Sequence, residues 1–415
     1  MTLGAAPVLK IGSMKVGIYL GDQSPDTGGG YTFQADLFHA FSRLVSESQH
    51  RFMVFGREEH RESVLTATSN RVGFSSLPKR TPVDRIQFML QRDMSFARAH
   101  WRRKGWLQRQ AEQEDIECMW FLGSDCHLLD MPYIAVVWDL QHRTLPWFPE
   151  VAYQGEWDAR EAANAWFLRR ATAVITGTRA GADEVMRFYQ IQPNVLKILP
   201  HPTPSAALRA AKAGPRDSES DVLGKYGIGR PYLIYPAQFW AHKNHVTLLD
   251  AVSRLRQQGI QLDVVFTGSD KGNRPYCERV SRELGLTEFV HFLGFVPADD
   301  LISLYRYAVA LAYVSHGGPE NLPPLEAFAL GCPVLAANVP GAHEQLGDCV
   351  LYLNPHSAES IAEACRQILD DSGLRERLTL AGRERAQKWT GEDFVRGVFA
   401  ILDDIEPMRR TWGVP

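Results

Sequence analysis

The sequence lacks three features that would mark a special class of protein. Its six cysteines form no C-x-x-C pair, no apolar run is long enough to cross a bilayer, and 45 Lys and Arg are balanced by 48 Asp and Glu. We therefore expect no disulfide framework, no zinc site, no spanning helix and no general nucleic-acid binding. The first fourteen residues lack the apolar core of a signal peptide, which favours a cytoplasmic protein.

What the chain does contain is a repeated alternation of strand and helix patterns. A length of 415 residues exceeds one ordinary core and predicts two domains. The alternation stops in a stretch rich in Pro, Ser and Gly, residues 200–230, and then restarts. Strands that alternate with helices indicate an α/β fold with parallel sheets covered on both faces. The expected strands are Lys15–Leu20, Phe52–Phe55, Cys118–Leu122, Tyr133–Trp138, Ala173–Thr176, Tyr232–Tyr235, Leu262–Thr267, Val290–Leu293, Val309–Val314 and Val334–Ala336.

The segment HGGPENLPPLEAFALGCPVLA, residues 316–336, combines a loop with a short apolar helix. Its two adjacent prolines suit the start of that helix, and the following glycine suits its end. The loop follows an expected strand, and the carboxyl ends of parallel strands are where open α/β sheets bind ligands. Glu326, near the helix start, either complements the helix dipole or accepts hydrogen bonds from a vicinal diol such as ribose.

The residues PENLPPLEAFALGCPVLA resemble the signature of the retaining glycosyltransferases of family four, which have the two-domain GT-B fold. In that family two glutamates, separated by seven residues, flank a glycine-rich loop, and the second holds the ribose of the nucleotide-sugar donor. The resemblance gives this second role to Glu326. The first position is Gly318 here, so either Glu320 supplies the carboxylate or the amides of residues 317–322 act alone.

Other segments extend the resemblance over most of the chain. PYLIYPAQFWAHKNHVTLLDAV resembles the family's strand, loop and helix with a basic pair for the pyrophosphate; Lys243 matches the lysine, and Gln238 takes the arginine position. Because a helix dipole disfavours a lysine at a helix start, an anion at this site is favoured. TGGGYTF resembles the family's first glycine loop, DVVFTGSDKG a second loop at the cleft, and VHFLGFV the segment that contacts the base. The donor-binding residues implied in this way are Gly29, Gly30, Gln238, Lys243, Gly268, Ser269, Phe295, Asn321, Leu322 and Glu326.

The loop VVWDLQHRTLPWFPE occupies the place where the family has a histidine–aspartate pair lining the sugar pocket. Asp139 matches the aspartate, and Trp138 stands where the histidine is usual. His142, three residues further on, either replaces that histidine or is an ordinary loop residue. The resemblance therefore implies four candidate catalytic residues, which are Asp139, His142, Lys243 and Glu320.

Two segments of the first domain are candidates for contact with an acceptor or a membrane. Arg143, Trp147 and Phe148 form either an acceptor surface or loop packing. Residues 84–110 combine an apolar stripe with arginines on the other side, so they form either a surface helix or a helix that touches anionic lipid. Because family members often use lipid-linked acceptors, a peripheral position on the inner membrane face is a further expectation.

The resemblance also implies how the chain is divided. We expect a Rossmann-like acceptor-binding domain at residues 1–203, a linker at 204–229, a Rossmann-like nucleotide-sugar-binding domain at 230–388 and a terminal helix at 389–415 that returns to the first domain. No convincing D-x-D motif or metal-ligand cluster occurs in the sequence. We therefore expect neither a metal nor another cofactor, with Lys243 and amide dipoles stabilising the leaving diphosphate.

The resemblance implies a retaining hexosyltransferase of surface-polysaccharide assembly. It would move a hexose or deoxyhexose from a nucleotide sugar, with GDP-mannose as the first choice, to a saccharide or lipid-linked glycan. Two alternatives remain at this point, because Gly318 and Gln238 depart from the family pattern. One is a nucleotide-sugar epimerase or hydrolase of the same fold, and the other is a non-catalytic protein that binds nucleotide sugars.

Overall fold

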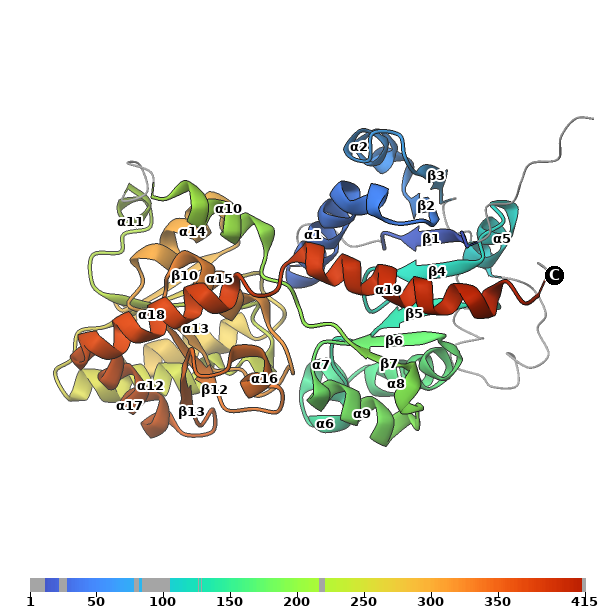
Figure 1. The fold of residues 1–415 in the computed structure, drawn as a ribbon. Coiled ribbons are helices and arrows are strands. Elements are labelled where there is room, and N and C mark those ends of the chain that lie inside the picture. Colours follow the sequence, from blue (N-terminus) through green and yellow to red (C-terminus); the bar gives the residue numbers. More distant parts are fainter. Residues whose placement is uncertain are drawn as a thin grey trace, which may run out of the picture.

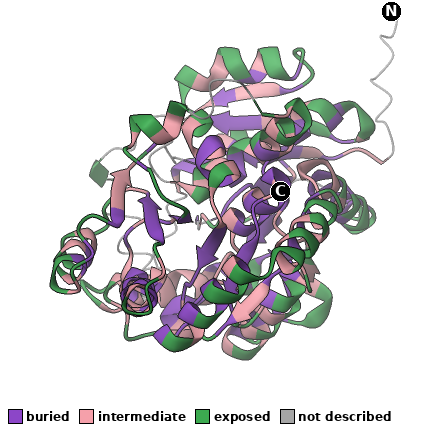
Figure 2. Ribbon diagram, turned by 90° about the vertical axis from the view of Figure 1, so that its left-hand side faces the viewer, coloured by how far each residue is buried: buried purple, intermediate pink, exposed green. Residues whose placement is uncertain are grey.

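The structure is a computed structural model that describes residues 12–21, 28–77, 82–83, 105–125, 127, 129–215 and 221–412. Two parallel sheets lie next to each other, each flanked by helices (Figure 1). The strands of both sheets form the buried interior, and the outward faces of the surrounding helices are exposed (Figure 2). The expected α/β architecture with two Rossmann-like domains is therefore confirmed.

The first sheet has seven strands in the order β3-β2-β1-β4-β5-β6-β7, and every neighbouring pair is parallel. The strand order reverses between β1 and β4, which makes the carboxyl end of β1 the expected ligand crevice. The strands are β1 (Lys15–Tyr19), β2 (Arg51–Gly56), β3 (Gly73–Ser76), β4 (Cys118–Phe121), β5 (Tyr133–Val136), β6 (Ala173–Thr176) and β7 (Leu196–Ile198). The α-helices are α1 (Gly29–Leu44), α2 (Arg61–Ala67), α5 (Trp106–Gln113), α6 (Gln141–Thr144), α7 (Pro149–Ala152), α8 (Glu156–Phe167) and α9 (Arg179–Tyr189).

The second sheet has six parallel strands in the order β10-β9-β8-β11-β12-β13, with its reversal between β8 and β11. Its strands are β8 (Tyr232–Pro236), β9 (Asp263–Thr267), β10 (Val290–Gly294), β11 (Ala310–Tyr313), β12 (Val334–Ala337) and β13 (Leu351–Leu353). Its α-helices are α12 (His245–Gln257), α13 (Arg274–Glu283), α14 (Ala298–Tyr307), α15 (Leu322–Leu330), α16 (Ala342–Leu346), α17 (Ala358–Asp370) and α18 (Ser372–Ala386).

Every strand expected from the sequence overlaps an observed strand, but three strands were missed. These are β3, β7 and β13, each at an edge of its sheet. They are three or four residues long and only partly buried, so they carry no continuous apolar run. A pattern search for buried strands does not find them, because such a strand shows neither a buried run nor a clean alternation.

The described part of the stretch between the domains contains two helices. Residues 204–229 contain α10 (Ser205–Ala213) and α11 (Asp221–Lys225). Ala207 of α10 belongs to the core of the second domain, and Ser205 donates a hydrogen bond from its backbone N–H to Asp36 of α1 at 2.9 Å. The connection is thus packed on one domain and hydrogen-bonded to the other.

The last helix of the chain crosses to the first domain (Figure 1). This helix, α19 (Gly391–Arg409), begins with a capping box between Thr390 and Asp393. Phe394 packs edge-on against Phe33 of α1, with ring centroids 5.6 Å apart, and Phe399 also belongs to the first-domain core. The chain therefore passes between the domains twice, near residues 200 and 389, where Trp389 Nε1 donates to Pro200 O at 2.7 Å.

Three predictions concern the cysteines, the basic amphipathic stretch and membrane-spanning helices, which the structure describes only in part. Five of the six cysteines are described, and all five are free. Residues 84–104 of the basic amphipathic stretch lie outside the described residues, and α5 covers only its end. Within the described part of the chain, no helix combines the length and the apolar character that spanning a membrane requires.

Candidate active site

The crevices of the two sheets face each other, and loops from both domains come into contact there. A Cβ atom placed on Gly28, just before α1, would lie 3.3 Å from Gln238 Nε2 of the second domain. A Cβ atom on the neighbouring Gly29 would lie 3.8 Å from Leu322 at the start of α15. The glycine loop of the first domain therefore approaches the predicted donor-binding loops of the second, and glycine permits this approach. Gly30 follows in the first turn of α1.

Lys243 lies at the end of a short 3-10 helix, Ala241–Lys243, directly before α12. Its ammonium donates a hydrogen bond to Tyr313 Oη at 2.9 Å and lies 3.5 Å from Asn321 Oδ1. Tyr313 ends β11, and Asn321 is the residue that caps α15. Among the described residues no carboxylate forms an ion pair with Lys243, so its positive charge is held by neutral dipoles.

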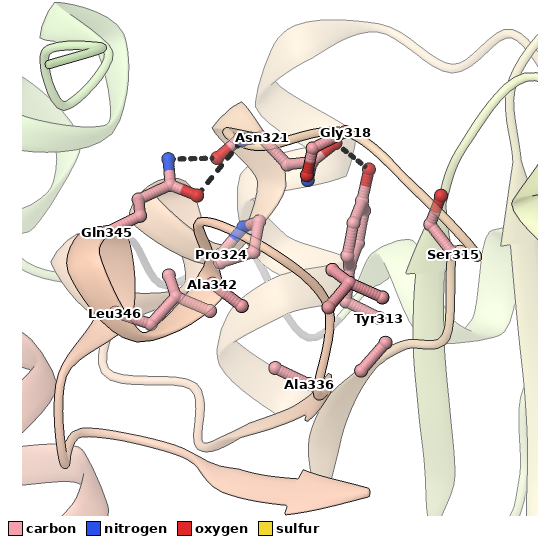
Figure 3. A pocket seen from close by; sticks show the side chains of 11 residues that line it. Tyr313, Ser315, Gly318, Asn321, Pro324, Ala336, Ala342, Gln345 and Leu346 are labelled. Carbon is pink, nitrogen blue, oxygen red and sulfur yellow. Dashed lines mark hydrogen bonds between the residues drawn. The ribbon is translucent and has the colours of Figure 1, made fainter. Parts of the chain in front are cut away.

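The loop beside Lys243 is fixed by a pair of hydrogen bonds that Figure 3 shows. Asn321 N donates to Gln345 Oε1 at 3.0 Å, and Gln345 Nε2 donates back to Asn321 O at 2.8 Å. Gly318 has φ +106°, a conformation that side chains rarely adopt. Tyr313, Gly318, Asn321 and Gln345 line one small pocket. Because Asn321 N is already paired with Gln345, this amide is not free for phosphate in this state.

Glu326 lies one turn inside α15. The prolines lie in the first turn of the helix and the glycine follows its last residue, as expected. The helix begins at Leu322, however, so Glu326 falls in the second turn and dipole complementation does not explain it. Its Oε2 accepts a hydrogen bond of 2.8 Å from the hydroxyl of Tyr305 on α14. Burial raises the pKa of the Glu326 carboxyl, partly offset by that hydrogen bond.

Glu320 extends away from its own domain. Its Oε1 accepts a hydrogen bond from His201 N at 2.8 Å, and its carboxylate occupies a notch at Gly177, where a Cβ atom would overlap it. The side chain is 3% exposed, and burial raises its pKa to about 8. The geometry therefore gives Glu320 a contact between the domains, and not a position beside Gly318 in the pocket.

His142 lies in the interior of the first domain. Its ring is fully buried, with Nε2 3.0 Å from Tyr189 Oη and 3.3 Å from Glu161 Oε2. Burial lowers its pKa. Of the two interpretations left open by the sequence, this placement favours the ordinary structural histidine. Asp139, in the loop between β5 and α6, is partly exposed and accepts a hydrogen bond from Gln141 N at 3.0 Å.

Trp138 occupies the position of the missing histidine. Its ring packs edge-on against Phe33 with centroids 5.6 Å apart. Its indole Nε1 is buried and has no hydrogen-bond partner among the described residues. The indole can only donate a hydrogen bond, whereas a neutral histidine can also accept one, so the two side chains recognise different ligand atoms.

The remaining predicted donor-binding residues, Gly268, Ser269 and Phe295, belong to the second domain. Gly268 has φ +127°, and a Cβ atom there would lie 2.6 Å from Ala237 O, so only glycine fits. Ser269 Oγ accepts a hydrogen bond from Gln238 Nε2 at 3.0 Å. Phe295 follows β10 with 68% of its surface exposed.

Two further contacts between the domains were not predicted. Glu344 of α16 accepts hydrogen bonds from the first two backbone N–H groups of α9, Arg179 N at 2.5 Å and Ala180 N at 2.9 Å. Glu150 of α7 accepts from His242 N at 2.9 Å and also contacts the ring Nδ1 of His242. No local pattern marks these glutamates, because their partners lie more than 90 residues away in the sequence.

The chain is similar to known proteins in sequence and in fold. Residues 220–385 match the family described as glycosyl transferases group 1. The chain is 28% identical over 260 residues to a D-inositol 3-phosphate glycosyltransferase of Salinispora arenicola, covering 59% of this chain and 58% of that protein. It is 30% identical over 178 residues to O-antigen chain mannosyltransferase B of Escherichia coli, covering 41% and 46%. The chain thus spans about half the length of the curated relatives it matches.

Solved structures extend the likeness to the whole fold. WaaG, a glycosyltransferase involved in lipopolysaccharide biosynthesis, superposes with a TM-score of 0.65 at 18% identity, covering 93% of this chain and 99% of that one. Anabaena HepE in complex with UDP and glucose superposes with a TM-score of 0.66 at 15% identity, covering 94% and 100%. The two facing domains have the GT-B fold. Residues 220–385, which lie mainly in the second domain, are thus similar to the glycosyl transferases group 1.

Proposed function

We propose that the chain is a retaining glycosyltransferase that moves a hexosyl or deoxyhexosyl unit from a nucleotide-sugar donor to a saccharide or lipid-linked acceptor. The observation that carries the proposal is the approach of the glycine loop to Gln238 and Leu322, with Lys243 beside Asn321, the residue before Leu322. A cation with no carboxylate partner among the described residues, next to close-approaching backbone, suits the diphosphate of such a donor. The family of the second domain agrees with this assignment.

In the proposed reaction the second domain stabilises the leaving diphosphate. Lys243 supplies positive charge, and Gln238 supplies an amide donor. Glu326 and the residues near Gly268 would hold the nucleoside part of the donor. No step in this scheme requires an enzymic nucleophile or a metal ion, because the leaving phosphate itself accepts the proton of the acceptor hydroxyl on the face where the new bond forms. Contacts between the domains would exclude water from the reacting sugar.

GDP-mannose is our first choice of donor. A mannosyltransferase of O-antigen chains is among the relatives, although HepE was crystallised with UDP and glucose. We propose polysaccharide assembly as the setting and the cytoplasm, with peripheral contact to the inner membrane face, as the place.

A donor screen tests the proposal. The melting temperature would be measured with GDP, UDP, dTDP and ADP sugars, because a ligand that binds only the folded state raises it. The best donor would then be incubated with a mannose- or glucose-terminated acceptor panel, with and without a chelator. We expect one base to stabilise the chain and transfer to persist in the chelator. Release of free sugar without an acceptor product would instead indicate a hydrolase, and loss of transfer in the chelator would refute metal independence.

A further inference from the structure

Tyr313 connects the predicted phosphate-binding lysine to the loop that lacks the family's first acid. Its hydroxyl lies 2.9 Å from Lys243 Nζ and 2.6 Å from Asn321 Oδ1. An ammonium can only donate a hydrogen bond and an amide oxygen can only accept one. The hydroxyl therefore accepts from Lys243 and donates to Asn321, and both roles are fixed by its partners.

A second tyrosine, Tyr235, forms a hydrogen bond with the backbone of the same lysine. Tyr235, which is fully buried, donates from its hydroxyl to the backbone carbonyl of Lys243 at 2.6 Å. Its ring packs edge-on against the ring of Tyr313, with centroids 5.5 Å apart and planes at 89°. The backbone and the ammonium of Lys243 are thus held by two tyrosines that contact each other.

The far end of this chain of hydrogen bonds is anchored in α16. Gln345 holds the backbone of Asn321 through two hydrogen bonds (Figure 3). Asn321 Nδ2 donates to Gly318 O at 3.2 Å. With its nitrogen occupied in this way, the side-chain amide of Asn321 presents its oxygen to Tyr313. The network runs from α16 to Lys243 and passes the position where the family has an acid.

We propose that Tyr313, fixed by Asn321 and Gln345, is a positioning residue that directs the Lys243 ammonium to the donor's diphosphate and replaces the absent acid at Gly318. This inference rests on the proposed function. A carboxylate beside Lys243 would cancel part of its charge, whereas a hydroxyl and an amide orient the ammonium and leave the charge whole. The neutral network keeps Lys243 in place and available to an anion.

The test compares binding of a nucleoside diphosphate and of its parent nucleoside, using the base that stabilises the wild-type chain most. By calorimetry, Tyr313→Phe is expected to bind the diphosphate about tenfold more weakly and the nucleoside unchanged, since a hydrogen bond to a charged group is lost. The effect should vanish when Lys243→Ala is already present, so the double variant should match Lys243→Ala alone. Tyr226→Phe is the control, because the Tyr226 hydroxyl pairs with Asp300 on the surface.

A second measurement compares kcat with the KM for the donor in Tyr313→Phe. A purely structural role of Tyr313 in packing would not change these two constants by different factors. Tyr313→Phe should lower kcat more than it raises the KM for the donor, because charge on the leaving diphosphate grows in the transition state. Asn321→Asp is the second variant, which keeps the acceptor for Tyr313 but adds a negative charge. It should weaken diphosphate binding about tenfold at low salt and less at high salt.

The outcomes separate this inference from the proposed function. Equal losses for nucleoside and diphosphate in Tyr313→Phe, or additive effects with Lys243→Ala, would overturn the positioning role while transfer by the wild type stands. Unchanged diphosphate binding in Asn321→Asp would also overturn it. A wild-type chain that neither binds a nucleoside diphosphate nor transfers sugar would overturn both.

Discussion

The second-domain edge of the candidate site holds a paired polar network, and the first-domain edge holds a buried donor without a partner among the described residues. On the second-domain edge, Lys243, Tyr313, Asn321 and Gln345 form a continuous hydrogen-bonded network. On the first-domain edge, Trp138 Nε1 has no partner among the described residues. A network that is already hydrogen-bonded is preorganised and does not have to rearrange when a ligand binds. Such a network suits the diphosphate, because this group is common to all nucleotide sugars. An unpaired donor suits a ligand that completes the site, as an acceptor or the transferred sugar would.

The largest effect should come from the second-domain edge. Lys243→Ala removes the cation from the proposed leaving group and should lower kcat about 100-fold or more. Lys225→Ala, on a surface lysine that pairs with Asp300, is the matched control and should be neutral. Transfer rates under saturating donor measure this prediction, and equal rates in both variants would contradict it.

The next largest effect on transfer should come from the contact between Glu320 of the second domain and Gly177 of the first. Gly177→Ala places a methyl group where the Glu320 carboxylate lies, so the carboxylate must leave its notch and this contact between the domains is weakened. We expect transfer to fall about tenfold, because closure completes such sites. Gly177→Ala combined with Glu320→Ala should recover part of that loss by removing the overlap. Failure of the double variant to recover would show that Gly177 matters for another reason.

A pH dependence should follow from the same carboxyl group. The pKa of Glu320 is raised by burial from 4.5 to about 8, so the folded chain binds a proton that the unfolded chain releases between these values. Its contribution to stability is therefore present at low pH and is lost as the pH rises from about 4.5 to about 8. Over that window the wild type should lose about 2 kcal/mol relative to Glu320→Gln, less than the full shift because domain opening also hydrates the carboxylate. Parallel stability curves in denaturant titrations at several pH values would contradict the burial of this group.

The smallest effect belongs to the first-domain edge. Trp138→Phe removes the unpaired indole N–H and keeps an aromatic ring against Phe33. If this N–H binds a sugar hydroxyl, the KM for the acceptor should rise about threefold to tenfold, with diphosphate binding unchanged. If Trp138→Phe instead weakened diphosphate binding, the proposal that the two edges bind different ligand groups would be contradicted.

The sequence predicted the parts of the molecule that local signals determine. Buried central strands, the Pro-Pro start of α15 and its glycine end follow from neighbouring residues, and all appear in the structure. The family pattern also predicted Lys243, Gln238 and the glycine loop as donor-site residues. In the structure the glycine loop approaches Gln238, and Lys243 lies against Tyr313.

What the sequence did not predict depends on partners distant along the chain. The direction of Glu320 is set by Gly177 and His201 of the other domain, and that of His142 by Glu161 and Tyr189. Tyr313 was missed because a tyrosine at the end of a buried strand looks like core. Only the folded structure places its hydroxyl against Lys243.

The most direct test of the proposed donor site is a crystal structure with the nucleoside diphosphate that most stabilises the chain. We expect diphosphate oxygens within hydrogen-bonding distance of Lys243 Nζ, with the ammonium still on Tyr313 Oη and the ribose near Glu326. A diphosphate bound elsewhere, or one at the cleft with Lys243 turned away from it, would contradict the central claim.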